Sequence, residues 1–585
     1  STYVFGNMIG GDYYNSTSAA LGSNGSLVNG LNSIVLFGTG SNVTSAGNNV
    51  SGMVLSGQYA SKPFFFSGEG YTAAEEGTNL GIISLADSSA GMYLTGGASG
   101  RNEGTVSVGK QSVGIYAAGA GAYVVNNNGI INVGEESTGI FLSDGIRAEN
   151  LGTAEINGTG NKAVGIYSEN TAAGAVQITN DNKIDLAGEQ SIGIYASGNH
   201  NISNTGNILI GNSSDPDQPG VGIYQDGIAG SISNTGNINA GDNSIGIYNI
   251  NGTVTNSGSV TAGNGGTGIY TNGGTLNLNS GSSIAVGGNN AIGVYALNQT
   301  GTLTNNSAVT IGDSSYGFVF SGSTAPVFIN SQAAVTGNDS IFTFADSVLD
   351  VTNNAAVTMT GSNNIGYYLK NGGSVVNNAN ITGNTGTSNI GIYAKNSTIT
   401  NNADIILGDS VLTEYTAPNG IKYKTGYSVG IYGENSNITN NAGNTIQIGS
   451  DGIGIYSKGA GVTENYGTIT GTGNNAKGIF ADNSTVRNYG TINLTGDNVI
   501  GIAGQNSAYI YNDSSAVINV TGNDVTGIYL AGDSTKLVNN GIINITGTGV
   551  GIAYTPTVEL SNILDSTGAS KGSTSKYYEL PDMPS

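Results

Sequence analysis

One tripeptide recurs along the chain and constrains the fold more than any other feature. Gly-Ile-Tyr, with Val, Phe or Met at some copies, appears first in loose form at Gly91 and last at Gly551. About 19 copies lie roughly 26 residues apart, a spacing typical of solenoid repeats. A second pattern, Asn-x-Gly-x-Ile, follows roughly 10 residues after many of the copies. Each repeat therefore holds three short apolar runs separated by Asn and Gly.

Alternation of side chains predicts that these runs are strands. In the stretch from Ser191 to Ala196, the residues Ile192, Ile194 and Ala196 share one face. Three strands per turn of about 24 residues predict a right-handed parallel β-helix, a triangular solenoid of about 20 coils. Leucine-rich repeats, left-handed hexapeptide helices and propellers fit less well, because Leu is sparse, the spacing wanders and the period is too short.

The departures from the repeat suggest three parts. Residues 1–90 fit the pattern poorly and are expected to form an irregular N-terminal cap or first coils. Residues 91–555 carry the repeats, with an insertion at 409–428 that lengthens one interval. Residues 556–585 lose the pattern and are expected to form a tail or linker.

Two residue types recur at fixed places in the repeat. Asparagines such as Asn204 and Asn234 are placed at sharp corners, where they tolerate the left-handed conformation and can hydrogen-bond from coil to coil. Tyrosines such as Tyr195 and Tyr224 should point outward or into a corner and stack. An exposed aromatic stripe of this kind could alternatively hold sugar rings.

The composition of the chain argues against nucleic-acid binding, metal binding and the usual forms of catalysis. The net charge of −22 argues against nucleic acid as a partner. With no Cys and one histidine, His200, the chain lacks material for the usual nucleophilic triads and zinc sites, so we expect no cofactor, no metal and no enzymatic activity. A polysaccharide hydrolase or lyase stays the enzyme alternative, since neighbouring coils could pair two carboxylates such as Asp226 and Asp242.

No signal peptide opens the chain and no run of 18 apolar residues occurs. The expectation is a mature or excised soluble piece whose export signal and anchor lie elsewhere.

Two irregular segments supply the candidate partner-binding residues. The insertion gathers tyrosines and lysines where cations are otherwise rare, and insertions in solenoids map to loops on one face. The N-terminal segment carries an aromatic cluster. A partner-free surface hairpin and a simple cap are the alternatives. The candidate residues are Tyr415, Lys422, Tyr423, Lys424 and Tyr427 in the insertion, and Phe64, Phe65, Phe66 and Tyr71 in the N-terminal segment.

The two repeat patterns together, over about residues 80–555, resemble the passenger domains of large type V autotransporter adhesins, especially the RadD-like outer-membrane adhesins of Fusobacterium. This resemblance implies export through a C-terminal β-barrel, absent from this chain, and display on the surface of a Gram-negative bacterium. It also implies attachment to a host receptor protein or glycan, or to another bacterium, with roles in coaggregation and virulence. A non-binding spacer within a longer surface protein is the remaining alternative.

Overall fold

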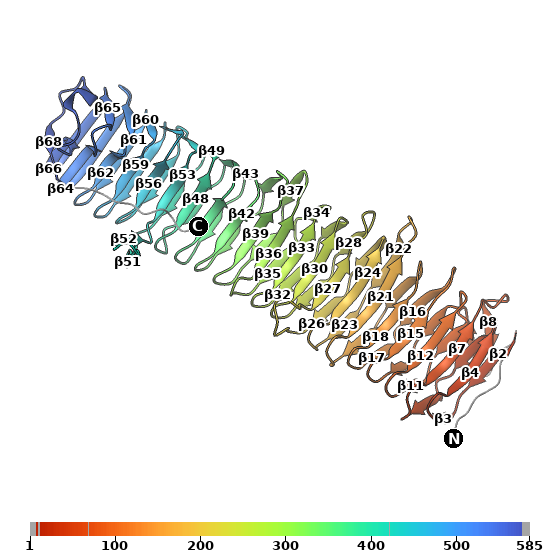
Figure 1. Ribbon diagram of the computed structural model, residues 1–585. Helices are drawn as coiled ribbons and strands as arrows, with labels where there is room; N and C mark the ends of the chain where they lie inside the picture. The colour runs from red at the N-terminus through yellow and green to blue at the C-terminus, as the bar shows by residue number, and fades with distance from the viewer. Residues whose placement is uncertain (1–7, 10–11, 68, 421, 576–585) are drawn as a thin grey trace. The chain divides into compact units, whose positions relative to one another are not determined.

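The computed structural model describes residues 8–9, 12–67, 69–420 and 422–575 (Figure 1). Among its described residues the regular elements are strands, apart from the one 3-10 turn η1 (Leu560–Asn562). Strand contacts divide the chain into two units, residues 1–297 and 298–585. Each unit is a parallel β-solenoid, which confirms the predicted fold class. The right-handed sense of the coil stays a prediction.

Each coil of the first unit contributes one strand to each of three faces, and the strands of these faces pair in parallel with their counterparts one coil away. The first face, which carries Gly-Ile-Tyr, consists of β1 (Met8–Ile9), β4 (Ser26–Leu31), β7 (Ser51–Ser56), β12 (Ala90–Thr95), β15 (Val113–Ala117), β18 (Thr138–Leu142), β21 (Val164–Asn170), β24 (Ile192–Gly198), β27 (Val221–Gln225), β30 (Ile245–Ile250), β33 (Thr267–Asn272) and β36 (Ile292–Leu297). The asparagine face consists of β2 (Asp12–Asn15), β5 (Ile34–Phe37), β10 (Gly77–Asn79), β13 (Gly100–Asn102), β16 (Tyr123–Asn127), β19 (Arg147–Leu151), β22 (Val176–Asn180), β25 (His200–Asn204), β28 (Ser231–Asn234), β31 (Thr253–Asn256) and β34 (Thr275–Leu278). The third face consists of β3 (Ser18–Leu21), β6 (Asn42–Ser45), β11 (Ile82–Ser84), β14 (Thr105–Ser107), β17 (Ile130–Val133), β20 (Glu155–Gly158), β23 (Lys183–Leu186), β26 (Asn207–Ile210), β29 (Asn237–Ala240), β32 (Ser259–Ala262) and β35 (Ser283–Val286).

The second unit repeats this arrangement. Its first face consists of β39 (Tyr316–Ser321), β42 (Ile341–Ala345), β45 (Ile365–Leu369), β48 (Ile390–Lys395), β53 (Val429–Glu434), β56 (Ile453–Lys458), β59 (Lys477–Asp482), β62 (Ile500–Gln505) and β68 (Lys571–Ser573). Its asparagine face consists of β37 (Thr302–Asn305), β40 (Val327–Asn330), β43 (Leu349–Asn353), β46 (Gly373–Asn377), β49 (Ser397–Asn401), β54 (Asn437–Asn440), β57 (Val462–Asn465), β60 (Thr485–Asn488), β63 (Tyr509–Asn512), β65 (Lys536–Asn539) and β67 (Ile563–Asp565). Its third face consists of β38 (Ala308–Thr310), β41 (Ala334–Thr336), β44 (Val357–Met359), β47 (Ile381–Gly383), β50 (Ile405–Leu407), β55 (Thr445–Ile448), β58 (Thr468–Thr472) and β61 (Thr491–Thr495), while β64 (Val517–Leu530) and β66 (Ile542–Tyr554) run from this face onto the first.

The Gly-Ile-Tyr motif contributes to the packing of the solenoid interior. Its isoleucines, for example Ile194 and Ile223, are fully buried and pair across neighbouring coils. A Cβ atom on Gly193 would lie 2.5 Å from the carbonyl oxygen of Gly222, so only glycine fits beside the next coil. The motif therefore combines an inward apolar side chain with a close approach of backbones.

A ladder of buried asparagine amides runs along the asparagine face. In the first unit each Nδ2 from Asn79 to Asn234 donates to the Oδ1 of the asparagine one coil further on, at 2.8–3.0 Å. Leu278 occupies the next position, and the buried Nδ2 of Asn256 has no hydrogen-bond partner among the residues that the structure describes. The predicted coil-to-coil bonding of Asn204 and Asn234 is thus confirmed, but neither has the predicted left-handed backbone.

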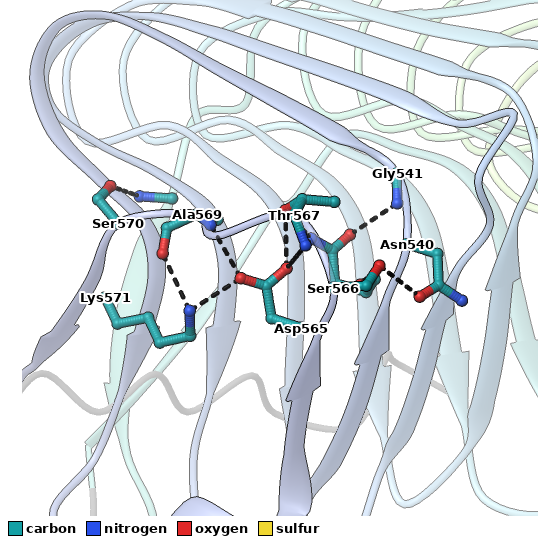
Figure 2. A network of polar contacts seen from close by, with 10 residues as sticks. Asn540, Gly541, Asp565, Ser566, Thr567, Ala569, Ser570 and Lys571 are labelled. Carbon is teal, nitrogen blue, oxygen red and sulfur yellow. Dashed lines mark hydrogen bonds and ion pairs between the residues drawn. The ribbon is translucent and has the colours of Figure 1, made fainter.

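The second unit has its own ladder, from Asn305 to Asn539, with all amides pointing the same way. It ends on Asp565, whose carboxylate accepts from Asn539 Nδ2 at 2.9 Å, Thr567 Oγ1 at 2.7 Å and Lys571 Nζ at 2.8 Å (Figure 2). A carboxylate suits this end because a ladder of donors requires a final group that only accepts.

The structure resolves what the two end segments form. Residues 12–67 and 69–90 form coils of the three faces with a hairpin inserted, that is, the first of the coils rather than a separate cap. At the other end, where a tail or linker was predicted, β67 (Ile563–Asp565) and β68 (Lys571–Ser573) pair with β65 and β66 and continue the solenoid. Residues 576–585 of that predicted tail, and residues 1–7 and 10–11 of the predicted cap, lie outside the described residues.

No helix in the described ranges has the length and apolar character needed to span a membrane.

Candidate functional site

The predicted insertion folds as an antiparallel hairpin between β50 and β53. Its strands are β51 (Thr413–Thr416) and β52 (Lys422–Thr425), with Thr413 opposite Thr425 and Tyr415 opposite Tyr423. Figure 1 labels this hairpin outside the three faces. Both strands are largely exposed, as the sequence predicts for a surface hairpin.

The five candidate residues of the insertion have different environments. Tyr415 and Tyr423 stack with ring centroids 5.5 Å apart, and Tyr415 is 45% exposed. Lys424 is exposed. Lys422 Nζ lies 3.5 Å from Glu414 Oε1, and because both side chains are exposed this ion pair contributes little to stability. Tyr427 packs against the apolar cluster on the first face, and burial raises its pKa to about 12. Tyr427 therefore anchors the hairpin, and the tyrosine pair faces solvent.

The hairpin is tied to the coils at its base. Val411 N donates to Ser388 Oγ at 3.0 Å, and Ser428 N donates to Ser410 Oγ at 2.7 Å. The first bond ties the insertion to the preceding coil and the second joins its two ends to each other, so the hairpin projects from a defined position.

A trough of about 370 Å³ lies between the hairpin base and three successive coils. The coils form one wall of the trough. Each coil contributes an apolar residue of the first face and, two positions earlier in the sequence, a polar residue at the corner that precedes this face. The hairpin supplies the other wall through Val411, Thr413, Thr425, Gly426 and Tyr427. The apolar row is Ile341, Ile365 and Ile390, and the polar row is Asp339, Asn363 and Ser388.

The N-terminal aromatic cluster forms a second hairpin, β8 (Phe64–Phe66) and β9 (Tyr71–Ala73), inserted between β7 and β10. Phe66 is 5% exposed and packs with Ile34, Leu36 and Ala73. Phe64 lies half-buried against the same cluster, and Tyr71 donates its hydroxyl to Glu103. Only Phe65, 58% exposed, is available to a partner. Most of this cluster therefore attaches the hairpin to the asparagine face.

Charged residues that the sequence did not single out support this hairpin. Glu76, fully buried, accepts from the backbone N of Tyr59 at 3.0 Å and Ser99 at 2.8 Å, and pairs with Lys62 at 2.5 Å. Glu75, 4% exposed, lies 3.7 Å from Arg101. The adjacent Glu-Glu pair was a visible signal, but the cations that neutralise it come from other coils and from the inserted segment.

The aromatic column of the first unit is a structural stack. Tyr93, Tyr116, Phe141, Tyr167, Tyr195, Tyr224, Tyr248, Tyr270 and Tyr295 stack in that order with centroids 4.5–5.5 Å apart. Stacking covers both faces of every ring inside the column, so a sugar cannot lie on them and only ring edges and hydroxyls meet solvent. The predicted stacking is confirmed, and the alternative of a sugar platform loses its geometric basis.

His200, the one histidine of the chain, lies inside the solenoid. It begins β25, is fully buried, and its ring nitrogens lie 2.8 Å from Ser168 Oγ and 3.0 Å from the carbonyl oxygen of Gly198. Ser168 is also fully buried. Because no carboxylate holds Nδ1 and no substrate can reach Ser168, this pair stabilises the interior instead of forming a nucleophile.

The carboxylates of the enzyme alternative lie apart. Asp226 follows β27 at the end of the first face, where it accepts from Gly198 N at 2.6 Å. Asp242 follows β29 on the third face and accepts from Asn264 N at 2.9 Å. Two different corners of the coil therefore hold these carboxylates, each bound to backbone. Within the described ranges, no group of three or more His, Asp or Glu side chains is arranged to hold a metal ion.

Part of the chain is similar to a known protein family. Residues 264–478 match the family model of the BigA third pectate lyase-like domain. The matched region, which includes the hairpin β51–β52 and the trough, is thus similar to a β-helical domain of a bacterial surface adhesin-like protein. No curated protein and no solved structure matches the chain.

Proposed function

We propose that this chain is the β-helical part of a surface-displayed bacterial adhesin, and that the hairpin β51–β52 with the trough beneath it contacts the target. The observation that carries the proposal is the hairpin itself. It is inserted between two coils whose strands stay paired, is fixed at its base by Ser388 and Ser410, and presents the Tyr415–Tyr423 pair to solvent. Loops held on a rigid scaffold are where binding residues concentrate.

The similarity of residues 264–478 to the BigA domain supports a cell-surface role. Attachment to host cells or to other bacteria, display on the outer membrane of a Gram-negative bacterium, and the relation to fusobacterial RadD-like adhesins are part of the proposal. The target is a receptor protein or a glycan on the partner surface.

A binding assay with the purified, fluorescently labelled chain tests the proposal on epithelial cells and on a panel of bacteria. In the test variant a short Gly-Ser turn replaces residues 412–426. The matched control replaces residues 214–218, another exposed loop that carries no aromatic residue. We expect attachment by the wild type and the control and its loss in the test variant. Attachment by none of the three, or by all three equally, contradicts the proposal.

We also propose that the chain is not an enzyme. The buried Ser168–His200 pair and the separated positions of Asp226 and Asp242 support this view. A reducing-sugar assay on a polysaccharide panel checks it, because release of reducing ends by the wild-type chain would contradict it.

A further inference from the structure

The trough beneath the hairpin has walls of two chemical kinds. Ile341, Ile365 and Ile390 pair with one another across successive coils and form a continuous apolar strip. Asp339 and Asn363 run beside this strip with exposed side chains. A ligand that fills the trough must therefore present an apolar face to one wall and hydrogen-bonding groups to the neighbouring row.

The hairpin extends this surface outward. Residues at alternate positions of a strand share a face, so Thr413 and Tyr415 of β51 point to the same side, opposite Thr425 and Tyr423 of β52. Thr413 and Thr425 line the trough. The stacked tyrosine pair therefore continues the trough-facing side of the hairpin.

The backbone of the polar row offers no edge for a peptide strand. The amide nitrogens of Asp339, Asn363 and Ser388 donate to Ser362 O, Thr387 O and Asp409 O of the next coil at 2.9–3.0 Å. A peptide that binds by strand addition needs unpaired main-chain groups. Recognition in the trough must instead use side chains.

Charge excludes one class of ligand. Among the described residues that line the trough, Asp339 is the only charged one, and the chain as a whole carries a net charge of −22. An anionic ligand would meet a carboxylate without a cation in the lining to balance it.

We infer that the trough binds an uncharged pyranose sugar, one or two residues long, such as the end of a surface glycan. A pyranose has an apolar C–H face and a rim of hydroxyls, which matches the isoleucine strip and the row of Asp339 and Asn363. The volume of about 370 Å³ lies within the usual range of small-ligand sites. This inference rests on the proposed adhesin function and names the ligand of its site.

Saturation-transfer NMR on the purified chain tests the inference with methyl glucoside, methyl galactoside, N-acetylglucosamine and the anionic N-acetylneuraminic acid. Thr413→Phe blocks the trough, and Thr416→Phe, on the opposite face of the same strand, is its control. Asn363→Gly removes one amide at a left-handed position that glycine accepts, and Asn475→Gly makes the same change at an equivalent corner outside the trough.

We expect at least one neutral sugar to bind, with no signal from N-acetylneuraminic acid. Binding should be lost in Thr413→Phe and weakened roughly five-fold in Asn363→Gly, the effect of about one hydrogen bond, while both controls bind as the wild type does. Absence of binding by every neutral sugar, preference for the acidic sugar, or unchanged binding in Thr413→Phe would overturn the inference.

The two proposals fail separately. Cell attachment by a wild-type chain that binds none of the neutral sugars overturns the sugar site and leaves the adhesin function in place. Sugar binding by a chain that attaches to no cell overturns the adhesin function and leaves the site in place.

Discussion

Removal of one amide from the asparagine ladder should destabilise a defined group of coils. Asn204 is fully buried at the end of β25. Its Nδ2 donates to Asn234 Oδ1 at 2.9 Å and its Oδ1 accepts from Asn180 Nδ2 at 2.8 Å. In Asn204→Ala both neighbours lose a buried partner, and each buried unsatisfied group costs about 1–3 kcal/mol. The expected loss is about 3 kcal/mol after partial relaxation toward other acceptors.

The loss should be local, because coils of a solenoid contact only their neighbours. Hydrogen exchange followed by mass spectrometry measures it as faster exchange in residues 176–240, and urea unfolding monitored by far-UV circular dichroism reports any global effect. Asn207→Ala is the matched control, since Asn207 is exposed and its bond with Asn237 lies in solvent. The control should change stability by less than about 0.5 kcal/mol.

Equal exchange in Asn204→Ala and Asn207→Ala would refute the reasoning. It would mean that the ladder amides find water or other partners at no cost, so that the buried column adds nothing to the stability of the coils.

Three further predictions concern titration and packing. Burial lowers the pKa of His200, so the folded state favours the neutral ring. The free energy of unfolding should be highest above the unfolded pKa of about 6.5 and decrease as pH falls below it. Urea unfolding at a series of pH values measures this decrease, which should be absent in His200→Gln. Burial would raise the pKa of Asp565, but hydrogen bonds from Lys571, Thr567 and Asn539 hold it well below its usual range. The last coil should therefore be stable above about pH 4 and unfold locally at lower pH. Hydrogen exchange in residues 563–573 measures this local unfolding, and Asp565→Asn should show fast exchange there already at pH 7. Gly193→Val should place side-chain carbon against Gly222 O and lower the thermal midpoint, whereas Gly174→Val, with open space around it, should leave the midpoint unchanged.

The sequence revealed the coils wherever the repeat kept its spacing. It left a cap and first coils both open before residue 91, because the β8–β9 hairpin separates Gly52 of β7 from Gly91 of β12 and hides their common register. It missed the last coil because Asp565 stands where earlier coils have asparagine. In both places the strand pairing continues while the local motif changes.

The candidate site was predictable only in part. An insertion rich in tyrosine indicates a surface hairpin, and the β51–β52 pairing confirms it. The trough was not predictable, because its walls are built by residues more than 20 positions apart along the chain, such as Ile341, Ile365 and Ile390. Their sequence signal is an isoleucine before Gly or Phe in three consecutive repeats, which by itself is indistinguishable from ordinary strand residues.

The location of the trough follows from the geometry of insertion. In a regular coil the outward side chains of the first face are exposed to solvent. They become part of a pocket only where an inserted segment of the chain packs over them. A hairpin inserted at the corner before β53 adds a second wall next to Ile390 while the ladder below it stays paired, since β50 still pairs with β55 and β48 with β53. A solenoid can therefore gain a binding site without disturbing its core, and the exposed tip of the hairpin can vary freely while Ser388 and Ser410 keep the base in place.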